Sequence, residues 1–535
     1  MPGAFRVRGI VEGFYGPPWS HAARLDVLSF VGERGMNTYV YAPKDEPKHR
    51  AQWREPYDPD EIETFAHVRA HAAAVGITTA CAISPGLDID YDAPPDRAAL
   101  LAKLQPLLDV GITWIVLALD DIPLSPGLAP RQGALATWLL DELRGSSADA
   151  RLTVCPTEYV GTRAGDYLST LGQHLPMEID VMWTGPTVCS PELRADDAAT
   201  WRAAAGGRSV IVWDNFPVND GMMDRALHLG PYTGREARLS EVVEGVLCNP
   251  MVQPYASLVG LATACEFLRD PDVYDPWEAW ERAIHDVGGD RSTGLRALAR
   301  ACADSPLAPP ATLPLMVAVD ALAADVGGPG WRDTIADMAR ELRAARALDD
   351  VFPADGDARA AELAPWASAA AREARAGLAA LALLQHLHPV ATLDERGRGV
   401  ARGPDADACL QRVFGVVFAW ADARRNERIV YGPRFTLHPA IVRTDDDRTV
   451  LDIDLAVRDD ENAIDALCRL ALEHYRAWTH HPVGALRVLV DGVERNVAVD
   501  GGFDADGAVA LVRCGTFSTR VTGATEYPFT DARLS

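Results

Sequence analysis

Long apolar runs and an excess of positive charge are both missing from this sequence. No stretch of about 18 apolar residues occurs, so we expect no transmembrane helix. The first residues, MPGAFRVRGIVEG, lack the apolar core of a signal peptide, which favours a cytoplasmic location. The formal net charge of the 535-residue chain is -25, and so acidic a protein repels phosphate backbones and anionic lipids. We therefore expect neither nucleic acid nor a membrane as a partner.

Sequence motifs of metal, nucleotide and serine-hydrolase chemistry are also absent. The nine cysteines are scattered without a CxxC pair, which predicts buried, reduced thiols. No His/Cys spacing suits a metal, no glycine-rich loop suits a phosphate, and no GxSxG occurs. We therefore expect neither a metal nor a cofactor. Lysine is rare too: only three occur, and Lys44 and Lys48 share the segment APKDEPKHR, which indicates either a need for a compact ammonium or chance clustering.

Short apolar runs, each followed by a helical stretch, fill the first 270 residues. Most runs are continuous rather than alternating, as in a parallel sheet that is buried on both faces. The predicted strands cover residues 6–13, 38–44, 78–86, 114–121, 152–159, 178–185, 209–215 and 243–250. Eight strand–helix units predict an α/β fold of the closed (β/α)8 (TIM) barrel type, with an open doubly wound sheet as the alternative. No GxGxxG follows the first strand, which disfavours the open sheet.

The segment DPDEIETFAHVRAHAAAVG carries the strongest helix signals. Asp58 is a candidate N-cap, Pro59 suits the first helical position, and Gly76 marks the end. Apolar residues at helical spacing form a stripe of Ile62, Phe65 and Val68. The sequence therefore predicts an amphipathic helix here, with its apolar stripe packed on the sheet.

Three regions follow from the patterning. We expect a catalytic barrel over residues 5–270, a helical bundle rich in Ala, Leu and Arg over 271–390, and a small α+β domain of unknown role over 405–535. In the last region, alternating strands within 448–460 and 485–502 flank a helix predicted at 463–478. A homodimer, if one forms, is expected to use the amphipathic faces of the helical bundle.

Polar and aromatic side chains gather where the predicted strands end. In a barrel of parallel strands, the loops that follow the strands build the active site at one end. Carboxylates and amides suit sugar hydroxyls and aromatic rings suit pyranose faces, so these residue types favour a sugar site. The strand ends supply Glu12, Gly13, Phe14, Tyr15, Lys44, Asp45, Asp120, Asp121, Glu158, Tyr159, Trp183, Thr184, Trp213, Asp214, Asn215 and Asn249.

The segment LALDDIP places Asp120 and Asp121 side by side at the end of an apolar run. Neighbouring carboxylates repel, so we expect one of them to keep its proton to a higher pH than a free aspartate, as general acid–base catalysis requires. Consecutive residues cannot easily flank a glycosidic bond as the two carboxylates of ordinary retaining glycosidases do. One could instead hold a 2-acetamido group that acts as the nucleophile, while the other protonates the leaving oxygen. The alternative is a strand-to-loop turn in which they cap backbone N–H groups.

Seven segments of the barrel region resemble glycoside hydrolase family 84, the retaining β-N-acetylglucosaminidases known as O-GlcNAcases, some of them called hyaluronidases. In order, they are GIVEGFYGPPWS, MNTYVYAPKDEPKHRAQWRE, LALDDIP, CPTEY, VMWTGP, VIVWDNFPVND and GVLCNP. The resemblance implies a retaining exo-β-N-acetylglucosaminidase that removes terminal β-linked GlcNAc from glycosides or glycoproteins by substrate-assisted catalysis through an oxazoline. The alternatives are an endo-acting, hyaluronidase-like hexosaminidase and a GlcNAc-binding barrel without catalysis.

The resemblance also implies roles for residues at matching positions. Asp120 would orient the acetamido nitrogen, Asp121 would be the general acid and then the base, and Tyr159 would bond the acetamido region as the ring closes. The expected substrate-binding residues are Gly13, Lys44, Asn215, Asp220 and Asn249 for hydroxyls and acetamide, Trp213 for the acetyl methyl, and Phe14 and Tyr15 for the floor. At Glu46 the family leads us to expect Asp, and we assign Glu46 no direct role.

Each of these roles has a structural alternative. Tyr159 and Trp213 could be packing at the barrel rim, and Lys44 could simply pair with Asp45 or Glu46. Asn249 precedes a proline and could be only a turn residue. By strand alternation Asp214 should face away from the site, so we interpret it as structural.

Overall fold

The protein was analysed as a computed structural model, which describes residues 3–309 except 164 and 225, residues 331–387, and strands β9–β16 beyond them. The chain divides into two compact units. The first is Met1–Ser292 with Cys302–Ala311, and the second is Thr293–Ala301 with Thr312–Ser535.

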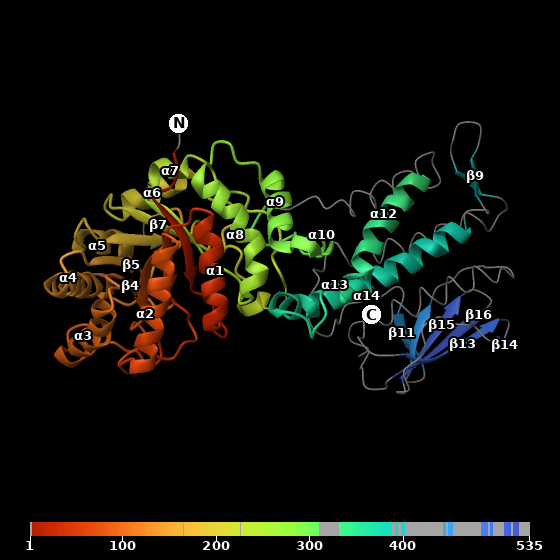
Figure 1. The fold of residues 1–535 in the computed structure, drawn as a ribbon, viewed down its shortest axis with the longest axis horizontal. Coiled ribbons are helices and arrows are strands. Elements are labelled where there is room, and N and C mark those ends of the chain that lie inside the picture. The colour runs from red at the N-terminus through yellow and green to blue at the C-terminus, as the bar shows by residue number, and fades with distance from the viewer. Residues whose placement is uncertain are drawn as a thin grey trace. The chain divides into compact units, whose positions relative to one another are not determined.

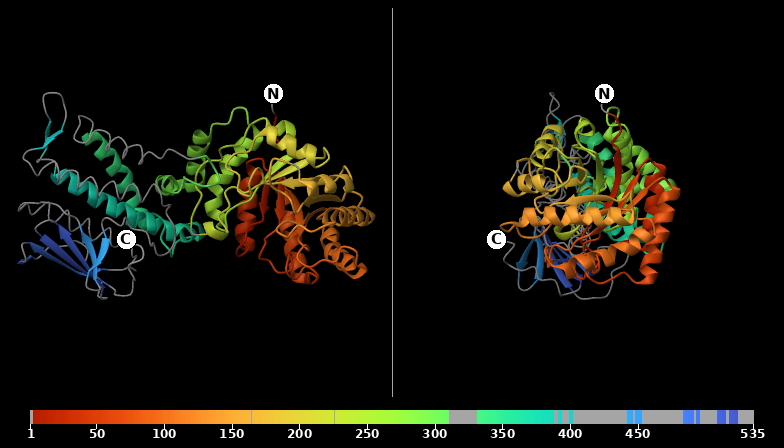
Figure 2. Two further views of the ribbon diagram at one scale, coloured as in Figure 1. Left: turned by 180° about the vertical axis from the view of Figure 1, so that it is seen from behind. Right: turned by 90° about the vertical axis from the view of Figure 1, so that its left-hand side faces the viewer.

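Eight parallel strands close into a barrel in the first unit (Figures 1 and 2), in the order β1 to β8, and β1 pairs with β8. Each strand overlaps its predicted range, so the (β/α)8 barrel is confirmed and the open sheet is wrong. The strands are β1 (Val7–Glu12), β2 (Thr38–Tyr41), β3 (Thr78–Ile83), β4 (Trp114–Ala118), β5 (Arg151–Cys155), β6 (Asp180–Trp183), β7 (Val210–Asp214) and β8 (Gly245–Cys248).

A helix follows every strand and covers the outside of the barrel (Figure 2). Since each helix returns the chain to the start of the next parallel strand, all carboxyl ends of the strands meet at one end. The helices are α1 (His21–Glu33), α2 (Pro59–Ala74), α3 (Pro94–Asp109), α4 (Leu128–Ser146), α5 (Asp166–His174), α6 (Ala195–Ala204), α7 (Leu239–Val242) and α8 (Pro254–Arg269).

Helix α2 forms where its sequence signals predict it. Pro59 is its first residue, and the backbone N–H of Asp58 donates to Oε2 of Glu61 at 2.6 Å, as in a capping box. Phe65 is buried on the barrel side of the helix. Gly76 follows the helix with φ +80°, a left-handed conformation that glycine adopts without a Cβ clash.

Two apolar cores lie on the two faces of the barrel wall, because successive residues of a strand point to opposite faces. Val40 and Ala80 belong to the core inside the barrel, whereas Tyr39 and Cys81 belong to the core between strands and helices. The alternation continues to the strand ends. It therefore decides which polar residue faces the mouth, by which we mean the interior of the barrel at the carboxyl ends of its strands.

The second unit contains helices and a mixed sheet. Helix α10 (Ser292–Ala301) is followed by α12 (Trp331–Arg346), α13 (Leu348–Val351) and α14 (Ala358–Leu387), and α12 packs on α14. The predicted domain boundaries remain predictions, although α9 (Pro276–Gly288), assigned above to the bundle, belongs to the barrel unit.

Strands β9 (Ala391–Leu393) and β10 (Gly399–Ala401) pair antiparallel. A six-stranded sheet has the order β11-β12-β15-β16-β13-β14, in which only β12 and β15 pair parallel. Its strands are β11 (Val442–Asp445), β12 (Arg448–Asp452), β13 (Val483–Val490), β14 (Val493–Arg495), β15 (Ala508–Cys514) and β16 (Phe517–Gly523). The helix predicted at 463–478 lies outside the described residues. Among the described helices, none is long and apolar enough to span a bilayer.

Candidate active site

A buried ion pair lies in the mouth of the barrel. Lys44 follows β2 and Asp120 follows β4, and the Lys44 ammonium donates to Oδ2 of Asp120. Lys44 is 5% and Asp120 6% exposed. Burial lowers the pKa of Lys44, but the Asp120 carboxylate outweighs burial and holds this pKa above its ordinary value. The alternative partners considered for Lys44, Asp45 and Glu46, are therefore not the ones it binds.

The second oxygen of Asp120 differs from the first, because no described residue bonds to it. Oδ1 is buried and forms no hydrogen bond with any described residue. A buried acceptor left in this state costs about 1–3 kcal/mol, so an N–H group from a ligand would be stabilised there. Asp120 thus combines a fixed charge with one open acceptor position.

Asp121 points elsewhere, although it is the next residue. Its φ of 55° lies in the left-handed region, which breaks the strand alternation and leaves this side chain exposed. Oδ2 accepts from the Tyr15 hydroxyl at 2.8 Å, and Oδ1 accepts from the Tyr159 hydroxyl at 2.7 Å. One backbone position therefore separates a buried carboxylate from a carboxylate held between two phenols.

The expected raised pKa is wrong for Asp121. Burial raises its pKa, but the nearby Lys44 ammonium and the hydroxyl donors of Tyr159 and Tyr15 outweigh burial, and the pKa lies below its ordinary value. The prediction considered only the repulsion between the two aspartates. Three groups from other strand ends neutralise that repulsion in the folded protein.

Arg50 was missed by the sequence reasoning. Its Nη1 donates to the Tyr15 hydroxyl at 2.5 Å, and its Nη2 reaches the backbone oxygen of Asp121 at 3.4 Å. The residue lies in the loop between β2 and α2, not at a strand end, so the strand-end rule did not select it. Its place in the KHR triplet after Lys44 was the available signal. Arg50 anchors both Tyr15 and the Asp121 turn.

A second set of contacts joins the ends of β1, β7 and β8. The Gly13 N–H donates to Oδ1 of Asn249 at 3.2 Å, and Nδ2 of Asn249 donates to Oδ1 of Asn215 at 2.9 Å. Nε1 of Trp213 donates to the same Asn215 oxygen at 3.2 Å. A Cβ on Gly13 would lie 2.2 Å from the Trp213 ring, so the close approach of this ring requires glycine.

The Trp213 ring also connects this set to the buried ion pair. Nζ of Lys44 lies 5.4 Å from the centroid of the ring, within the range of a cation–π contact. The structure thus brings most of the predicted residues into one connected constellation at the mouth, from the ends of six strands.

Two predicted residues make contacts that their predicted roles did not include. Phe14 is fully buried and packs on Trp19, so in this structure its side chain supports the site from behind instead of forming its floor. Asp220 accepts from the backbone N–H of Tyr15 at 2.8 Å. Burial raises the pKa of Asp220, and the charges of Asp121 and Asp45 raise it further. Asp220 therefore positions the Tyr15 loop.

Two strand-end carboxylates face outward and are fully paired. Glu12 binds Nε and Nη2 of Arg24, both at 2.8 Å, and the Tyr39 hydroxyl at 2.6 Å. Asp214 binds Arg235 and the hydroxyl of Tyr232, each at 2.6 Å at its shortest. The interpretation of Asp214 as structural agrees with these contacts.

Within the described part of the chain, no group of three or more His, Cys, Asp or Glu side chains is arranged to hold a metal ion. The arrangement at the mouth contains groups that can give and take protons. It offers a buried carboxylate with an open acceptor, an accessible carboxylate with two phenols, a cation, amides and one indole ring.

Comparison with known proteins places this arrangement in a family. Residues 8–300 match the family model described as beta-N-acetylglucosaminidase. Protein O-GlcNAcase of Rattus norvegicus is 34% identical over 277 residues, and so is Protein O-GlcNAcase of Mus musculus. The matched region is 48% of this chain but only 29% of either relative, so the match spans under a third of the length of these curated relatives.

Two solved structures resemble the chain over a larger share of its length. A mutant of the Thermobaculum terrenum O-GlcNAc hydrolase is 30% identical with a TM-score of 0.65, over 78% of this chain and 97% of that one. CpGH84B is 25% identical with a TM-score of 0.66, over 79% of this chain and 73% of that one. Because the matching family model covers more than half of the sequence, the chain belongs to the beta-N-acetylglucosaminidase family, glycoside hydrolase family 84.

Proposed function

We propose that the protein is a retaining exo-β-N-acetylglucosaminidase that removes terminal β-linked GlcNAc from glycosides or glycoproteins. The observation that carries the proposal is the division between Asp120 and Asp121. Asp120 is buried, one of its oxygens binds the Lys44 ammonium, and the other has no partner among the described residues. Asp121 is exposed and accepts from the hydroxyls of Tyr15 and Tyr159. Two carboxylates in such different environments can take two roles in one reaction.

Asp120 acts on the acetamido group. The acetamido N–H of the sugar donates to the open Oδ1 of Asp120, and the Lys44 ammonium holds the other oxygen in place. This bond turns the acetamido oxygen toward the anomeric carbon. As positive charge develops on the acetamido nitrogen, the buried carboxylate stabilises it in surroundings from which water is excluded.

Asp121 transfers the proton. The acetamido oxygen forms a bond to the anomeric carbon, the bond to the aglycone oxygen breaks, and the Asp121 proton goes to that leaving oxygen. Asp121 then takes a proton from water as the water attacks the anomeric carbon and opens the oxazoline. Two inversions at one carbon give net retention. No protein atom bonds to the sugar.

The lowered pKa of Asp121 belongs to the site without substrate. Its two phenol donors stabilise the carboxylate. A glycosidic oxygen can only accept a hydrogen bond, and a bound sugar excludes water, so substrate binding favours the protonated acid. Asp121 thus takes up its proton as the substrate binds.

The first experiment is hydrolysis of aryl β-N-acetylglucosaminides by wild type and Asp121→Asn. We expect Asp121→Asn to lose activity on a poor leaving group by about 10²–10⁴-fold and to recover rate with an activated aryl group, which needs no proton. The matched control is Asp45→Asn, which also removes an exposed loop carboxylate near Tyr15 and should keep most activity. Equal activity of wild type and Asp121→Asn would refute the acid role.

Product analysis separates the remaining alternatives. NMR of the first product should show the β-anomer of GlcNAc, and mass spectrometry during turnover should find no sugar attached to the protein. Hyaluronan should yield no oligosaccharide fragments, because the acidic chain repels this polyanion. Fragments of even size would favour an endo-acting hexosaminidase, and binding of GlcNAc without turnover would favour a binding barrel.

A further inference from the structure

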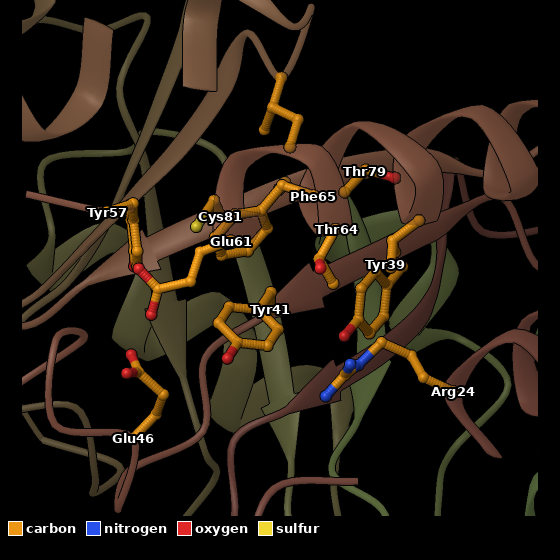
Figure 3. A pocket seen from close by; sticks show the side chains of 13 residues that line it. Arg24, Tyr39, Tyr41, Glu46, Tyr57, Glu61, Thr64, Phe65, Thr79 and Cys81 are labelled. Carbon is orange, nitrogen blue, oxygen red and sulfur yellow. The ribbon is translucent and has the colours of Figure 1, made fainter. Parts of the chain in front are cut away.

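A cavity of about 160 Å³ lies on the outer face of the barrel, away from the mouth (Figure 3). The outer faces of β2 and β3 form one wall, and α2 with the loops before it forms the other. Its polar and aromatic lining includes Arg24, Tyr39, Tyr41, Glu46, Tyr57, Glu61, Phe65, Thr79 and Cys81. A cavity of this size accommodates a six-membered ring or a few ordered waters.

Three polar atoms of this lining have no hydrogen-bond partner among the described residues: Oε2 of Glu46, the hydroxyl of Tyr57 and Oγ1 of Thr79. Tyr57 is only 8% and Thr79 only 7% exposed. The Tyr57 hydroxyl lies near the Cys81 thiol, which is a weak hydrogen-bonding group. Oε2 of Glu46 and Oγ1 of Thr79 have no such neighbour, and each unpaired buried group costs about 1–3 kcal/mol, so a ligand that bonds either atom would be stabilised.

Among the described residues, no cation forms an ion pair with Glu46, and the cations near it have other partners. Its Oε1 accepts from the backbone N–H of Lys48 at 3.0 Å, the backbone N–H of His49 also donates to the carboxylate, and the charge of Lys103 lowers its pKa. Burial raises the pKa of Glu46, and the charge of Glu61 adds to the rise. The Lys48 ammonium binds Asp58 at 2.9 Å and Glu61 at 2.7 Å.

The other two cations are occupied as well. Arg24 is bound to Glu12. Lys103 donates to the Glu55 backbone and lies 3.6 Å from the centroid of the Tyr57 ring. In Figure 3, Glu46 lies on the opposite side of Tyr41 from Arg24.

Aromatic rings surround the space beside Glu46. Phe65 contacts Tyr41 edge-on with ring centroids 5.0 Å apart, and it contacts Tyr57 at 4.9 Å. Ring faces attract cations, and a carboxylate attracts them further. An anion would meet the charges of Glu46 and Glu61, so the lining selects against it.

We propose that this outer cavity binds a small organic ammonium ion, with Glu46 as its counter-ion and the rings of Tyr41, Tyr57 and Phe65 as its walls. An ammonium carries three N–H donors, and Oε2 of Glu46 is an acceptor with no hydrogen-bond partner among the described residues. Glu46 lies in the same loop as Lys44 and Arg50, so an occupant would contact the segment that supplies two groups of the mouth.

Isosteric probes test the charge of the occupant. Isothermal titration of the full chain with benzylammonium, benzyl alcohol and benzoate should give binding for benzylammonium, at least about tenfold weaker binding for the alcohol, and none for benzoate. Glu46→Gln keeps the shape of the side chain and should weaken benzylammonium at least about tenfold while sparing hydrolysis. Thr64→Trp should narrow the cavity from its exposed side and also abolish binding.

Controls separate this cavity from the mouth. Asp121→Asn should leave benzylammonium affinity unchanged, because Asp121 is a carboxylate of the mouth. Three results would each overturn the proposal. They are equal affinities for the ammonium and the alcohol, unchanged binding in Glu46→Gln, and failure of benzylammonium to bind, which would mean that the cavity holds only water.

Discussion

Buried strand-end carboxylates occur on both faces of the barrel wall, and their hydrogen-bond partners differ between the two faces. On the outer face, Glu12 and Asp214 each bind an arginine through two nitrogens and a tyrosine hydroxyl. At the mouth, Asp120 has one lysine and an oxygen without a partner. The outer pairs complete their own hydrogen bonding and hold the fold together. Asp120 leaves a position that a substrate can complete.

The cation that pairs with each carboxylate also differs: it is arginine on the outer face and lysine at the mouth. Arginine stays charged at any relevant pH and fits a carboxylate with two parallel bonds, which suits a permanent structural pair. Lysine is a compact charge that can give up its proton when its surroundings change. The chain has only three lysines, and one of them, Lys44, is at the mouth. Under the proposed mechanism, this amine lies where the charge balance changes.

Among the variants that test this comparison, Asp120→Asn should have the largest effect. The neutral amide cannot stabilise the developing oxazolinium charge, so kcat/KM should fall by about 10²–10³-fold. The folded state should survive, because Lys44 can lose its proton when its carboxylate partner is removed. Hydrolysis of aryl glycosides with good and poor leaving groups measures the effect, and both should slow alike. If only poor leaving groups slowed, the roles of Asp120 and Asp121 would have to be exchanged.

Asp214→Asn should have the opposite profile. It leaves the guanidinium of Arg235 buried without its counter-charge, which should lower the free energy of unfolding by about 3–5 kcal/mol. Urea denaturation measures this loss, and turnover per folded molecule should stay near wild type. The double variant Asp214→Leu/Arg235→Met should regain much of the stability. A catalytic defect larger than the unfolded fraction would show that the outer pair also serves the site.

The positions of the elements could be predicted because burial imposes a local pattern. Continuous apolar runs marked the eight strands, and alternation placed Asp214 on the outer face, where it binds Arg235. Pro59 and Gly76 marked the ends of α2 for reasons confined to a few residues. These features depend on neighbours in the sequence, and so they were predictable.

Contacts between loops were not predictable in this way. Arg50 meets Tyr15 only because the β1 and β2 loops lie side by side at the mouth, and no periodicity in either segment encodes that meeting. The pKa of Asp121 depends on Lys44, Tyr159 and Tyr15, which come from three other loops. The prediction considered only the two aspartates, and it therefore gave the wrong direction for the pKa shift of Asp121.

The variant with the smallest expected effect tests the direction of the pKa shift of Asp121. In Tyr15→Phe, Asp121 loses one hydroxyl donor that stabilises its carboxylate but keeps the bond from Tyr159. The pKa of Asp121 should rise toward its ordinary value, so the protonated acid persists to higher pH. Because kcat/KM reports the free enzyme, its alkaline limb should move to higher pH. An alkaline limb that moved to lower pH would mean that Tyr15 stabilises the protonated form of Asp121. The carboxylates of the mouth and of the outer pairs would then differ less than the contacts of Asp121 indicate.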